Sequence, residues 1–576
     1  MSRTPNYDKK IEEILDSTEP GERVCDLTGE RWEMTQEEID WYKKFNVPPA
    51  VYAPLTRHKI SASFWIGYQW WNQHHAKTGA IIIAPYHPAT GVSVLPDKEW
   101  FEQDFSSAGV DDNATKSVFE IVHSLMLAVP FPAGSHTKEP ENSIALLSGG
   151  DRNSLFMIGC ESENSLFGWW SSRLVSSCLV WNSDNVSESY SISDSKDVHD
   201  SRFIRCCKDV ISSSFCFLCQ DVEYCFGATN QHHKKYIFFN EQLSQAEYEA
   251  RIKDVDFSRQ SEMTKWVERF YDLVENKTVW PENLSARIEN TTGEYNYDVN
   301  DCKECYACVK HSSNLFRCQY GAEGTQSAYA SPVFSSRCYD SSNIFQSDNI
   351  RFSYAAYRCQ NLEYCYLNYD CENCFGCVGL HRKKFHIFNK PYLEGVYWQK
   401  VDEIKCRMME ANEYGKFFPL WLSPMYFGES GGVNHYAARM DEWGTLGGKP
   451  FDAESAGAIG DLSQGIARSS KEIPDSINDM SDDDWVGKPV LDERIHRRFT
   501  FFKQELDYYR RKRLAPPNAH LTHRIISLLH ESNLAVFENK TCAKCSAQIL
   551  VGKNITFPNR KVLCRKCYAN YLEENG

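Results

Sequence analysis

The sequence has no run of about 18 apolar residues, the length that an α-helix needs to cross a bilayer. It also has no surplus of basic residues. The net charge of −15 at pH 7 argues against a general affinity for nucleic acid or anionic lipid, although a local basic face stays possible. No hydrophobic signal segment follows the first residues, MSRTPNYDKK. We therefore expect a protein without a membrane span, located in the cytoplasm or within a particle assembled there.

Catalytic signatures are also missing. The chain contains no recognisable phosphate loop, nucleophile elbow or paired-carboxylate motif, so no catalytic residue is predicted and a non-enzyme is favoured. At 576 residues it is too long for a single ordinary core, which predicts several domains.

Cysteine, by contrast, is abundant. The 23 cysteines are an odd number and gather in repeats, unlike the scattered pairs of a small disulfide scaffold. Reduced thiols are therefore expected.

Two stretches of the chain are copies of each other. CFGATNQHHKKYIFFNEQLSQAEY, from Cys225, aligns without a gap on CFGCVGLHRKKFHIFNKPYLEGVY, from Cys374, at an offset of 149 residues. We interpret this closing motif as an end-cap. Its glycine allows tight closure, its asparagine satisfies backbone groups, and a following helix, with a capping box at Ser244 and Glu247, shields strand edges.

Each closing motif carries a basic tetrad, HHKK or HRKK. A solvated turn is the simpler interpretation, and a duplicated anion or phosphate site is the alternative. The candidate anion-binding residues are His232, Lys234, Lys235, His381, Lys383 and Lys384.

A regular spacing leads up to both closing motifs. Aliphatic residues recur every 11 or 12 positions, each followed three positions later by a small residue, at Val175, Val186, Val198, Val210 and Val222 and again at Ile350 and Leu362. This pattern predicts a mainly β fold with α caps: two right-handed parallel β-solenoid lobes with helical end-caps. The cysteines in these repeats are interpreted as small packing residues, with metal binding left open. The register of the last repeat is also open, because the closing motif aligns Cys225 with Cys374 and the spacing aligns it with Cys377.

The chain ends form a second duplication. Adding 467 to a residue number takes Trp32 to Phe499, Glu38 to Glu505 and Arg57 to Arg524. These units are predicted to be small zinc-ribbon-like α+β modules flanking the lobes.

Within the C-terminal module, the spacing of Cys542, Cys545, Cys564 and Cys567 suits a zinc ribbon, in which two knuckles hold one structural zinc ion. The N-terminal counterparts His75, Thr78, Asp97 and Trp100 do not form such a site.

A further frame lies upstream in each module. Asp492, Ile495, His520 and His523 correspond to Cys25, Thr28, Ala53 and Thr56. Asp492, His520 and His523 form a possible weak metal site, although surface or capping histidines are the simpler interpretation.

These patterns predict a chain of seven segments. They are an N-terminal degenerate ribbon-like module (1–140), a first solenoid lobe (145–230), a helical cap (231–280), a second lobe (282–380), a cap (381–427), a Gly/Ser/Asp-rich flexible linker (428–490) and a C-terminal zinc-ribbon module (491–576).

Several motifs together resemble a known family. CFGCVGL with IFNKPY, YGKFFPLWLSP, ELDYYRRKRLAPP and the final double C-x2-C are similar to large Cys-rich β-helix-repeat proteins of uncultivated, small-genome bacteria. The resemblance implies repeats between treble-clef or ribbon-like zinc modules, and no established activity. It also implies cysteine pairs in the family where this chain has Ala53/Thr56 and His520/His523.

Three functions stay open. The first is a non-catalytic scaffold or binding protein, possibly part of a larger assembly, with protein partners or self-assembly. The second is a carbohydrate-binding or carbohydrate-active protein, with stacking by Trp65, Trp70, Trp71, Trp169 and Trp170. The third is nucleic-acid binding by the C-terminal module, whose segments RIHRRF and YYRRKR are basic.

Overall fold

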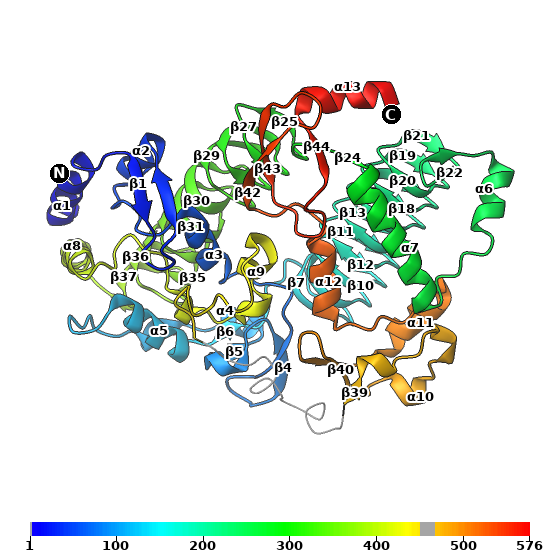
Figure 1. Cartoon of the computed structure of the whole chain (residues 1–576). Helices are drawn as coiled ribbons and strands as arrows, with labels where there is room; N and C mark the ends of the chain where they lie inside the picture. Colours follow the sequence, from blue (N-terminus) through cyan, green and yellow to red (C-terminus); the bar gives the residue numbers. More distant parts are fainter. Residues whose placement is uncertain (1–2, 450–466, 576) are drawn as a thin grey trace. The chain divides into compact units, whose positions relative to one another are not determined.

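A computed structural model describes residues 3–449 and 467–575 (Figure 1). The chain divides into two compact units that are discontinuous in sequence. Unit 1 consists of Met1–Ala133, Asn283–Phe451 and Ala535–Phe537, and unit 2 of Gly134–Glu282, Asp452–Leu534 and Glu538–Gly576. The N-terminal module thus belongs with the second repeat lobe (286–391), and most of the C-terminal module with the first repeat lobe (144–242).

The first repeat lobe consists of short strands that alternate between two sheets. A ten-stranded sheet has the order β23-β22-β20-β18-β16-β14-β12-β10-β8-β7, and a seven-stranded sheet the order β21-β19-β17-β15-β13-β11-β9. The strands are β7 (Ile144–Ser148), β8 (Leu155–Cys160), β9 (Ser162–Glu163), β10 (Leu166–Trp169), β11 (Ser172–Val175), β12 (Cys178–Trp181), β13 (Asp184–Ser187), β14 (Tyr190–Ser193), β15 (Lys196–His199), β16 (Arg202–Arg205), β17 (Lys208–Ile211), β18 (Ser214–Phe217), β19 (Gln220–Glu223), β20 (Phe226–Thr229), β21 (His232–Lys235), β22 (Ile237–Phe238) and β23 (Glu241–Gln242).

The predicted spacing is the pairing register of these strands. Val186 pairs with Val198, and Val210 pairs with Val222, in parallel and 12 residues apart. The first member of the series was assigned wrongly: Leu174, not Val175, pairs with Val186 and is buried, and Val175 is 43% exposed. The apparent spacing of 11 is therefore a one-residue error, which moves a side chain to the opposite face of a strand.

The repeats contain a backbone feature that the spacing does not reveal. Every third residue has a positive φ, for example Asn185 (56°), Glu188 (54°) and Ser191 (60°), and the residue after each points inward. Left-handed backbone costs a non-glycine residue roughly 1–2 kcal/mol. Asn and Asp tolerate it best, which accounts for their frequency at these bends.

Serine and cysteine line the interior next to the aliphatic residues. The Ser189 hydroxyl donates to the Ser187 carbonyl and accepts the backbone N–H of Ser201 at 3.1 Å, 12 residues on. Cys207 does the same for the N–H of Cys219, at 3.3 Å. The small residues therefore satisfy buried N–H groups between successive repeats, and a thiol substitutes for a hydroxyl there.

The second repeat lobe follows the same rules within a 12-stranded sheet, in which Ile350 pairs with Leu362 and Leu362 with Cys374. Its strands are β25 (Ala286–Glu289), β26 (Gly293–Glu294), β27 (Tyr297–Lys303), β28 (Cys305–Tyr306), β29 (Val309–Phe316), β30 (Thr325–Val333), β31 (Ser336–Phe345), β32 (Asp348–Arg351), β33 (Tyr354–Tyr357), β34 (Gln360–Glu363), β35 (Tyr366–Tyr369), β36 (Glu372–Phe375), β37 (Lys384–Ile387) and β38 (Lys390–Pro391).

Both closing motifs end their lobes in the same way. β22 pairs antiparallel with β23, and β37 with β38, so the parallel order stops there. Asn240 accepts the backbone N–H of Thr229, and Asn389 that of Val378, both at 2.8 Å. The expected role of the asparagine is confirmed.

The register of the last repeat is now defined. Cys225 belongs to the Ser/Cys row, because its N–H donates to Ser213, whereas Cys374 belongs to the aliphatic row below Leu362. The two rows are three residues apart, so the motif alignment and the spacing are both correct.

Helices cover one flank of the first lobe. The capping box of Ser244 and Glu247 starts α6 (Gln245–Ile252) as predicted. α7 (Gln260–Asp272) places Phe270 and Trp266 on Phe215 and Phe226, which belong to the ten-stranded sheet. α7 therefore covers the face of that sheet, and the β22–β23 hairpin closes its end.

The terminal modules provide the remaining elements. In unit 1 they are α1 (Pro5–Asp16), β1 (Gly21–Val24), β2 (Arg31–Met34), α2 (Gln36–Phe45), α3 (Pro54–Ala62), β3 (Trp71–His74), β4 (Ile81–Ala84), η1 (Pro88–Thr90), β5 (Val94–Leu95), α4 (Asp97–Phe101), η2 (Phe105–Ala108), α5 (Val118–Ala128), β6 (Phe131–Pro132), α8 (Glu394–Glu410), η4 (Leu420–Leu422), η5 (Phe427–Glu429) and α9 (Gly431–Tyr436).

In unit 2 and at its boundary they are η3 (Leu273–Lys277), β24 (Val279–Pro281), β39 (Arg468–Ser469), η7 (Ser470–Glu472), η8 (Ile477–Asp479), α10 (Asp482–Trp485), β40 (Val490–Asp492), β41 (Arg497–Phe499), α11 (Lys503–Lys512), α12 (Leu521–Leu529), β42 (Phe537–Thr541), β43 (Gln548–Gly552), β44 (Lys561–Leu563) and α13 (Arg565–Asn575). The middle of the predicted linker, 450–466, lies outside the described residues, and its described flanks include α9 and α10. Across the described ranges, no helix is both long and apolar enough to span a bilayer.

The terminal duplication is reproduced in the contacts of each unit. In unit 2 the buried Arg524 donates to Glu505 at 2.8 Å, and Tyr509 donates to the same carboxylate. In unit 1 Tyr42 donates to Glu38 at 2.8 Å, with the buried Arg57 guanidinium 3.7 Å away. The offset of 467 therefore relates two packed structures as well as two sequences.

Candidate metal centre

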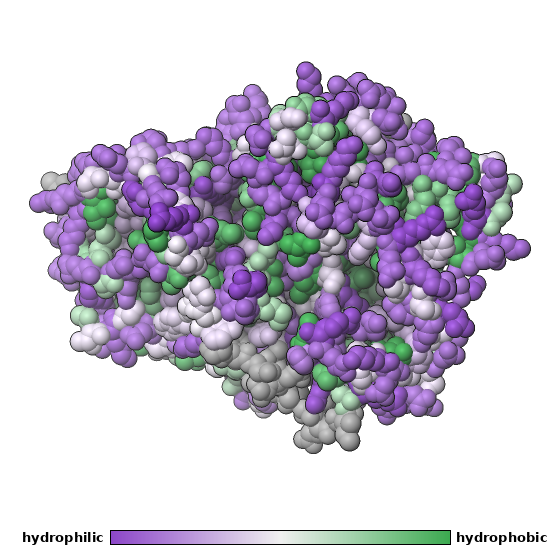
Figure 2. All heavy atoms as spheres, in the orientation of Figure 1, coloured by the Kyte–Doolittle hydropathy of each residue, from purple (hydrophilic) through white to green (hydrophobic). Residues whose placement is uncertain are grey.

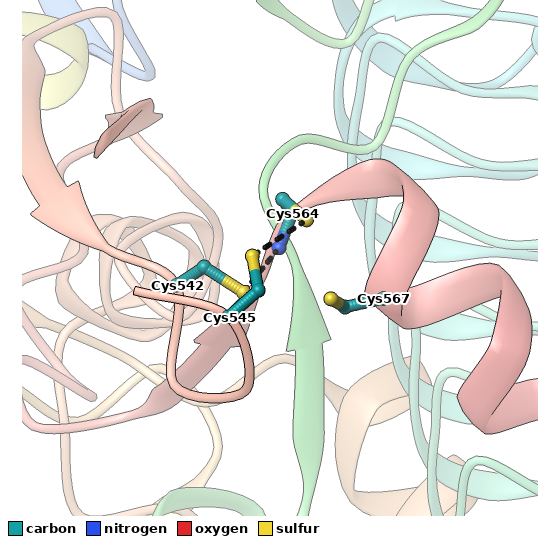
Figure 3. Close-up of side chains that lie close together, drawn as sticks. All are labelled: Cys542, Cys545, Cys564 and Cys567. Atoms are coloured by element: carbon teal, nitrogen blue, oxygen red, sulfur yellow. Dashed lines mark hydrogen bonds between the residues drawn. The ribbon is translucent and has the colours of Figure 1, made fainter. Parts of the chain in front are cut away.

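Four cysteine sulfurs meet in the C-terminal module (Figure 3). They lie within 4.8 Å of one another, and the sulfurs of Cys545 and Cys564 are 3.7 Å apart. A tetrahedral ion with metal–sulfur bonds of about 2.3 Å places its ligands roughly 3.8 Å apart. The four sulfurs are therefore spaced to hold one metal ion.

Two different structures provide the two cysteine pairs. Cys542 follows β42, and the turn to β43 contains Cys545 and closes with an N–H bond from Ser546 to the Cys542 carbonyl at 3.0 Å. Cys564 lies between β44 and α13, and Cys567 is in the first turn of α13. The predicted pair of knuckles is thus one knuckle and one helix start, since the second pair is on a helix.

The surroundings favour thiolates at this centre. Burial raises the pKa of Cys542, but N–H groups of Cys564, Cys545 and Lys544 outweigh burial and lower that pKa to about 6. The backbone N–H of Cys564 points at the Cys542 sulfur at 3.3 Å. The N-terminus of α13 also stabilises negative charge on Cys564 and Cys567.

The same frame occurs three more times. Its hairpin turn is nearly identical in Cys25, His75 and Cys542: each N–H donates to the carbonyl five residues on at 2.8 Å, and each carbonyl accepts an N–H from four residues on at 2.9–3.0 Å. The fourth residue after each has a positive φ, at Gly29 (70°), Gly79 (73°) and Ser546 (62°). The offset alignment therefore identifies real structural equivalents.

Hydrogen-bonding side chains occupy the equivalent positions in the two N-terminal frames. The Cys25 sulfur lies 3.7 Å from the Thr56 hydroxyl. The His75 ring accepts the N–H groups of Lys77 and Thr78 with Nδ1, and its Nε2 lies 3.1 Å from Glu99. These contacts close both turns without a four-ligand set.

The third frame is organised by a buried carboxylate. Asp492 accepts the N–H of His520 at 2.9 Å, contacts His523 Nδ1 at 3.2 Å and forms a two-point ion pair with Arg494. Burial raises the pKa of Asp492, but His523 and Arg494 outweigh it and hold that pKa far below its usual range. The His520 ring caps α12 by accepting the N–H of Thr522. Within 3–449 and 467–575, only the four cysteines form a group of three or more candidate ligands, so a weak site at Asp492, His520 and His523 stays a prediction.

The basic tetrads are largely engaged within the lobes. Lys235 pairs with Glu223, Lys384 with Glu372, and Lys383 with Asp104 at 2.7 Å. The ring of His381 packs against Trp100, with centroids 4.3 Å apart, and burial lowers the pKa of His381. The pKa of His232 is also lowered by burial. No anion is needed to balance the three paired lysines, and anion binding, with Lys234 included, stays a prediction.

The basic run of α11 also has partners in unit 2. Arg510 pairs with Asp482, Lys512 with Glu188, and Arg513 with Asp256, while Arg511 lies over the ring of Tyr508. The local charge of YYRRKR is therefore mostly neutralised by carboxylates that are distant in sequence.

The tryptophans proposed to stack on sugars are mostly part of the core. Trp70, Trp71 and Trp169 are buried and Trp65 is partly buried, while Trp170 is 47% exposed. A tryptophan cluster that binds a glycan is therefore not formed by these residues.

Neither a scan of protein-family models nor a search among curated proteins finds a match for this sequence. The functional argument therefore rests on the geometry of the chain itself.

Proposed function

We propose that the protein is a non-catalytic binding or scaffold protein, built from two right-handed β-solenoid lobes and stabilised by one structural zinc ion. A solenoid is supported by the parallel pairing at intervals of 12 residues, by the alternation of successive strands between two sheets, and by the bend at every third residue. The hand is proposed because parallel crossovers are nearly always right-handed.

The observation that carries the binding role is a groove of about 610 Å³ along the second repeat lobe. One wall is an exposed row spaced by 12 residues, Phe334, Gln346, Arg358 and Asp370, and the other runs from Ser336 through Asp348, Gln360 and Glu372 to Lys384. Neighbouring strands are about 4.8 Å apart, so the groove presents similar groups at regular intervals. Such a surface suits an extended partner.

Most charges in the groove are paired within its walls. Arg358 donates to both oxygens of Asp370, at 2.7 and 2.9 Å, and Asp348 is paired with Arg337. These pairs fix the side chains and leave little net charge. On the face drawn in Figure 2 the surface is mainly hydrophilic, with only small hydrophobic areas.

A photo-crosslinking residue at Gln360 tests this role. We expect the full-length protein, expressed in its source cells, to form an adduct of defined mass from Gln360 and not from the matched position Lys196 on the first lobe. The absence of an adduct at Gln360, or equal adducts at both positions, would contradict the groove as the binding surface.

The paired charges and planar amides of the groove also favour the carbohydrate alternative, because such groups hydrogen-bond to hydroxyls. Oligosaccharide binding that is lost in a Gln346→Ala/Gln360→Ala variant, with Gln220→Ala as the control, would support it. Unchanged binding in the groove variant would exclude this site.

Nucleic-acid binding by the C-terminal module is a further candidate. Lys561, Arg565 and Lys566 are exposed near the four cysteines, and no carboxylate partner for them is seen within the described ranges. Replacing these three residues by glutamine should abolish binding of the full-length protein to single-stranded DNA at low salt and leave bound metal unchanged. The same substitutions at Arg510, Lys512 and Arg513 should have little effect, because those residues have partners.

Zinc is proposed for the centre because four thiolates in a tetrahedron are the ligands of structural zinc sites. Metal analysis of the purified protein should give one zinc per chain, lost in a Cys545→Ser variant. Absence of metal in the wild type would exclude the site.

A further inference from the structure

A cavity of about 240 Å³ lies within unit 1, between the N-terminal module and the segment YGKFFPLWLSP. Its walls are mainly aromatic and aliphatic and include Leu27, Tyr52, Phe417, Trp421 and Leu446. A dry cavity of about 150 Å³ can hold benzene. This cavity therefore has room for one aromatic ring and a short polar group.

Charged residues lie at two places in the lining. Arg57 and Asp340 are both buried, and Arg57 donates to Asp340 through Nε at 3.2 Å and Nη2 at 3.0 Å. This pair is internally compensated, so it provides polarity without a free charge. Lys416 is the other lining cation.

Lys416 differs from Arg57 because it lacks a counter-ion. Its ammonium lies 5.5 Å from the centre of the Tyr52 ring, and no carboxylate of a described residue forms an ion pair with it. Burial lowers the pKa of Lys416, which shows that its charged form is poorly solvated. An anion beside it would restore the lost stabilisation.

The duplicated module shows that this lining is particular to the N-terminal copy. Adding 467 takes Leu27 to Arg494 and Tyr52 to Ala519. In the C-terminal copy the Arg494 guanidinium bonds to Asp492 and to the Asn518 carbonyl. An apolar wall in one copy is thus a charged, internally bonded group in the other.

We propose that this cavity binds a small aromatic monocarboxylate, whose ring packs among the aromatic walls and whose carboxylate pairs with Lys416. Aromatic walls favour a planar ring, and a largely apolar pocket with a few convergent polar groups is typical of small-molecule sites. The site lies apart from the groove and from the four cysteines, so it adds a second binding activity.

The test uses the full-length protein and two probes of nearly equal shape, phenylacetate and neutral phenylacetamide, in calorimetric titrations. Phenylacetate should bind at one site about tenfold more tightly than the amide, because only it pairs with Lys416. Lys416→Met should remove this preference. Lys44→Met is the matched control, since Lys44 is also a half-buried cation over a ring, 4.3 Å from the centre of Trp41, and is not part of the cavity.

A second variant separates the site from any folding defect. Leu27→Trp should fill the cavity and abolish binding of both probes, with the near-ultraviolet circular dichroism otherwise retained. The proposal is overturned if the wild type binds neither probe at millimolar concentrations, if it binds both equally, or if Lys416→Met keeps the preference for phenylacetate.

Discussion

Replacing Thr28, Ala53 and Thr56 by cysteine should convert the first frame into a second metal centre. With Cys25, the variant would have four thiols at the positions equivalent to Cys542, Cys545, Cys564 and Cys567. The hairpin turn at Cys25 already matches the one at Cys542, and the 3.7 Å between the Cys25 sulfur and the Thr56 hydroxyl is close to a tetrahedral edge. Little backbone movement is therefore required.

The expected magnitude has two parts of opposite sign. Ala53 is fully buried, so the added sulfur should destabilise the metal-free variant by about 1–3 kcal/mol through overpacking. A bound ion at roughly 1,000 times its Kd should add about 4 kcal/mol to the folded state. The variant should thus be less stable than the wild type with a chelator, and more stable by about 1–3 kcal/mol with zinc.

Metal analysis and thermal unfolding, each with zinc and with a chelator, measure both parts. The control is Thr28→Ser, Ala53→Ser and Thr56→Ser, which provides hydroxyls in place of thiols. A correctly folded cysteine variant that binds no more metal than the wild type would refute the equivalence of the frames.

Three further predictions concern single residues. Cys545 is exposed, so Cys545→Ser should lower the melting temperature through loss of the ion and not of packing, and the difference should vanish in chelator. Asp492→Asn should lower the free energy of unfolding in urea by about 3 kcal/mol at pH 7, because it breaks a buried ion-pair network. Since the folded-state pKa of Asp492 is depressed, its contribution is complete above the ordinary Asp pKa of about 3.9 and is lost as pH falls below it, so an undiminished difference in strong acid would contradict the assignment. Gly376 has a φ of 62°, and an added Cβ would lie 2.4 Å from the Phe388 ring, so Gly376→Ala should cost about 2 kcal/mol or more, whereas Gly395→Ala, with open space around it, should not.

Much of the repeat architecture was accessible from the sequence because its causes are local. The ladder from Val186 to Val222 is both a sequence spacing and a pairing register, and the four cysteines were identified from their spacing alone. The end-cap role of the closing motif also follows from residue types, since Asn240 bonds to Thr229, which is close to it in the chain.

Features set by distant parts of the chain could not be predicted. Leu179 and Phe203 have positive φ values, against their intrinsic preference, because the repeat geometry overrides it. The basic run of α11 was interpreted as a ligand site, yet Lys512 finds Glu188 more than 300 residues away. The helix that holds Cys564 and Cys567 lacked a distinguishing signal, because the same spacing suits a second knuckle.

The interleaved composition of the two units has a consequence for protein synthesis. The first repeat lobe ends its share of unit 2 at Glu282, and the next residue of that unit is Asp452, about 170 positions later. At roughly 5–20 residues per second, a ribosome needs on the order of 10–30 s to make the intervening chain. During that interval the lobe lacks the segments that later bury Tyr508 and Tyr509, so its aromatic face stays uncovered on the nascent chain. The order of the duplicated parts therefore makes chaperone access during translation a requirement that neither half would have if it were encoded alone.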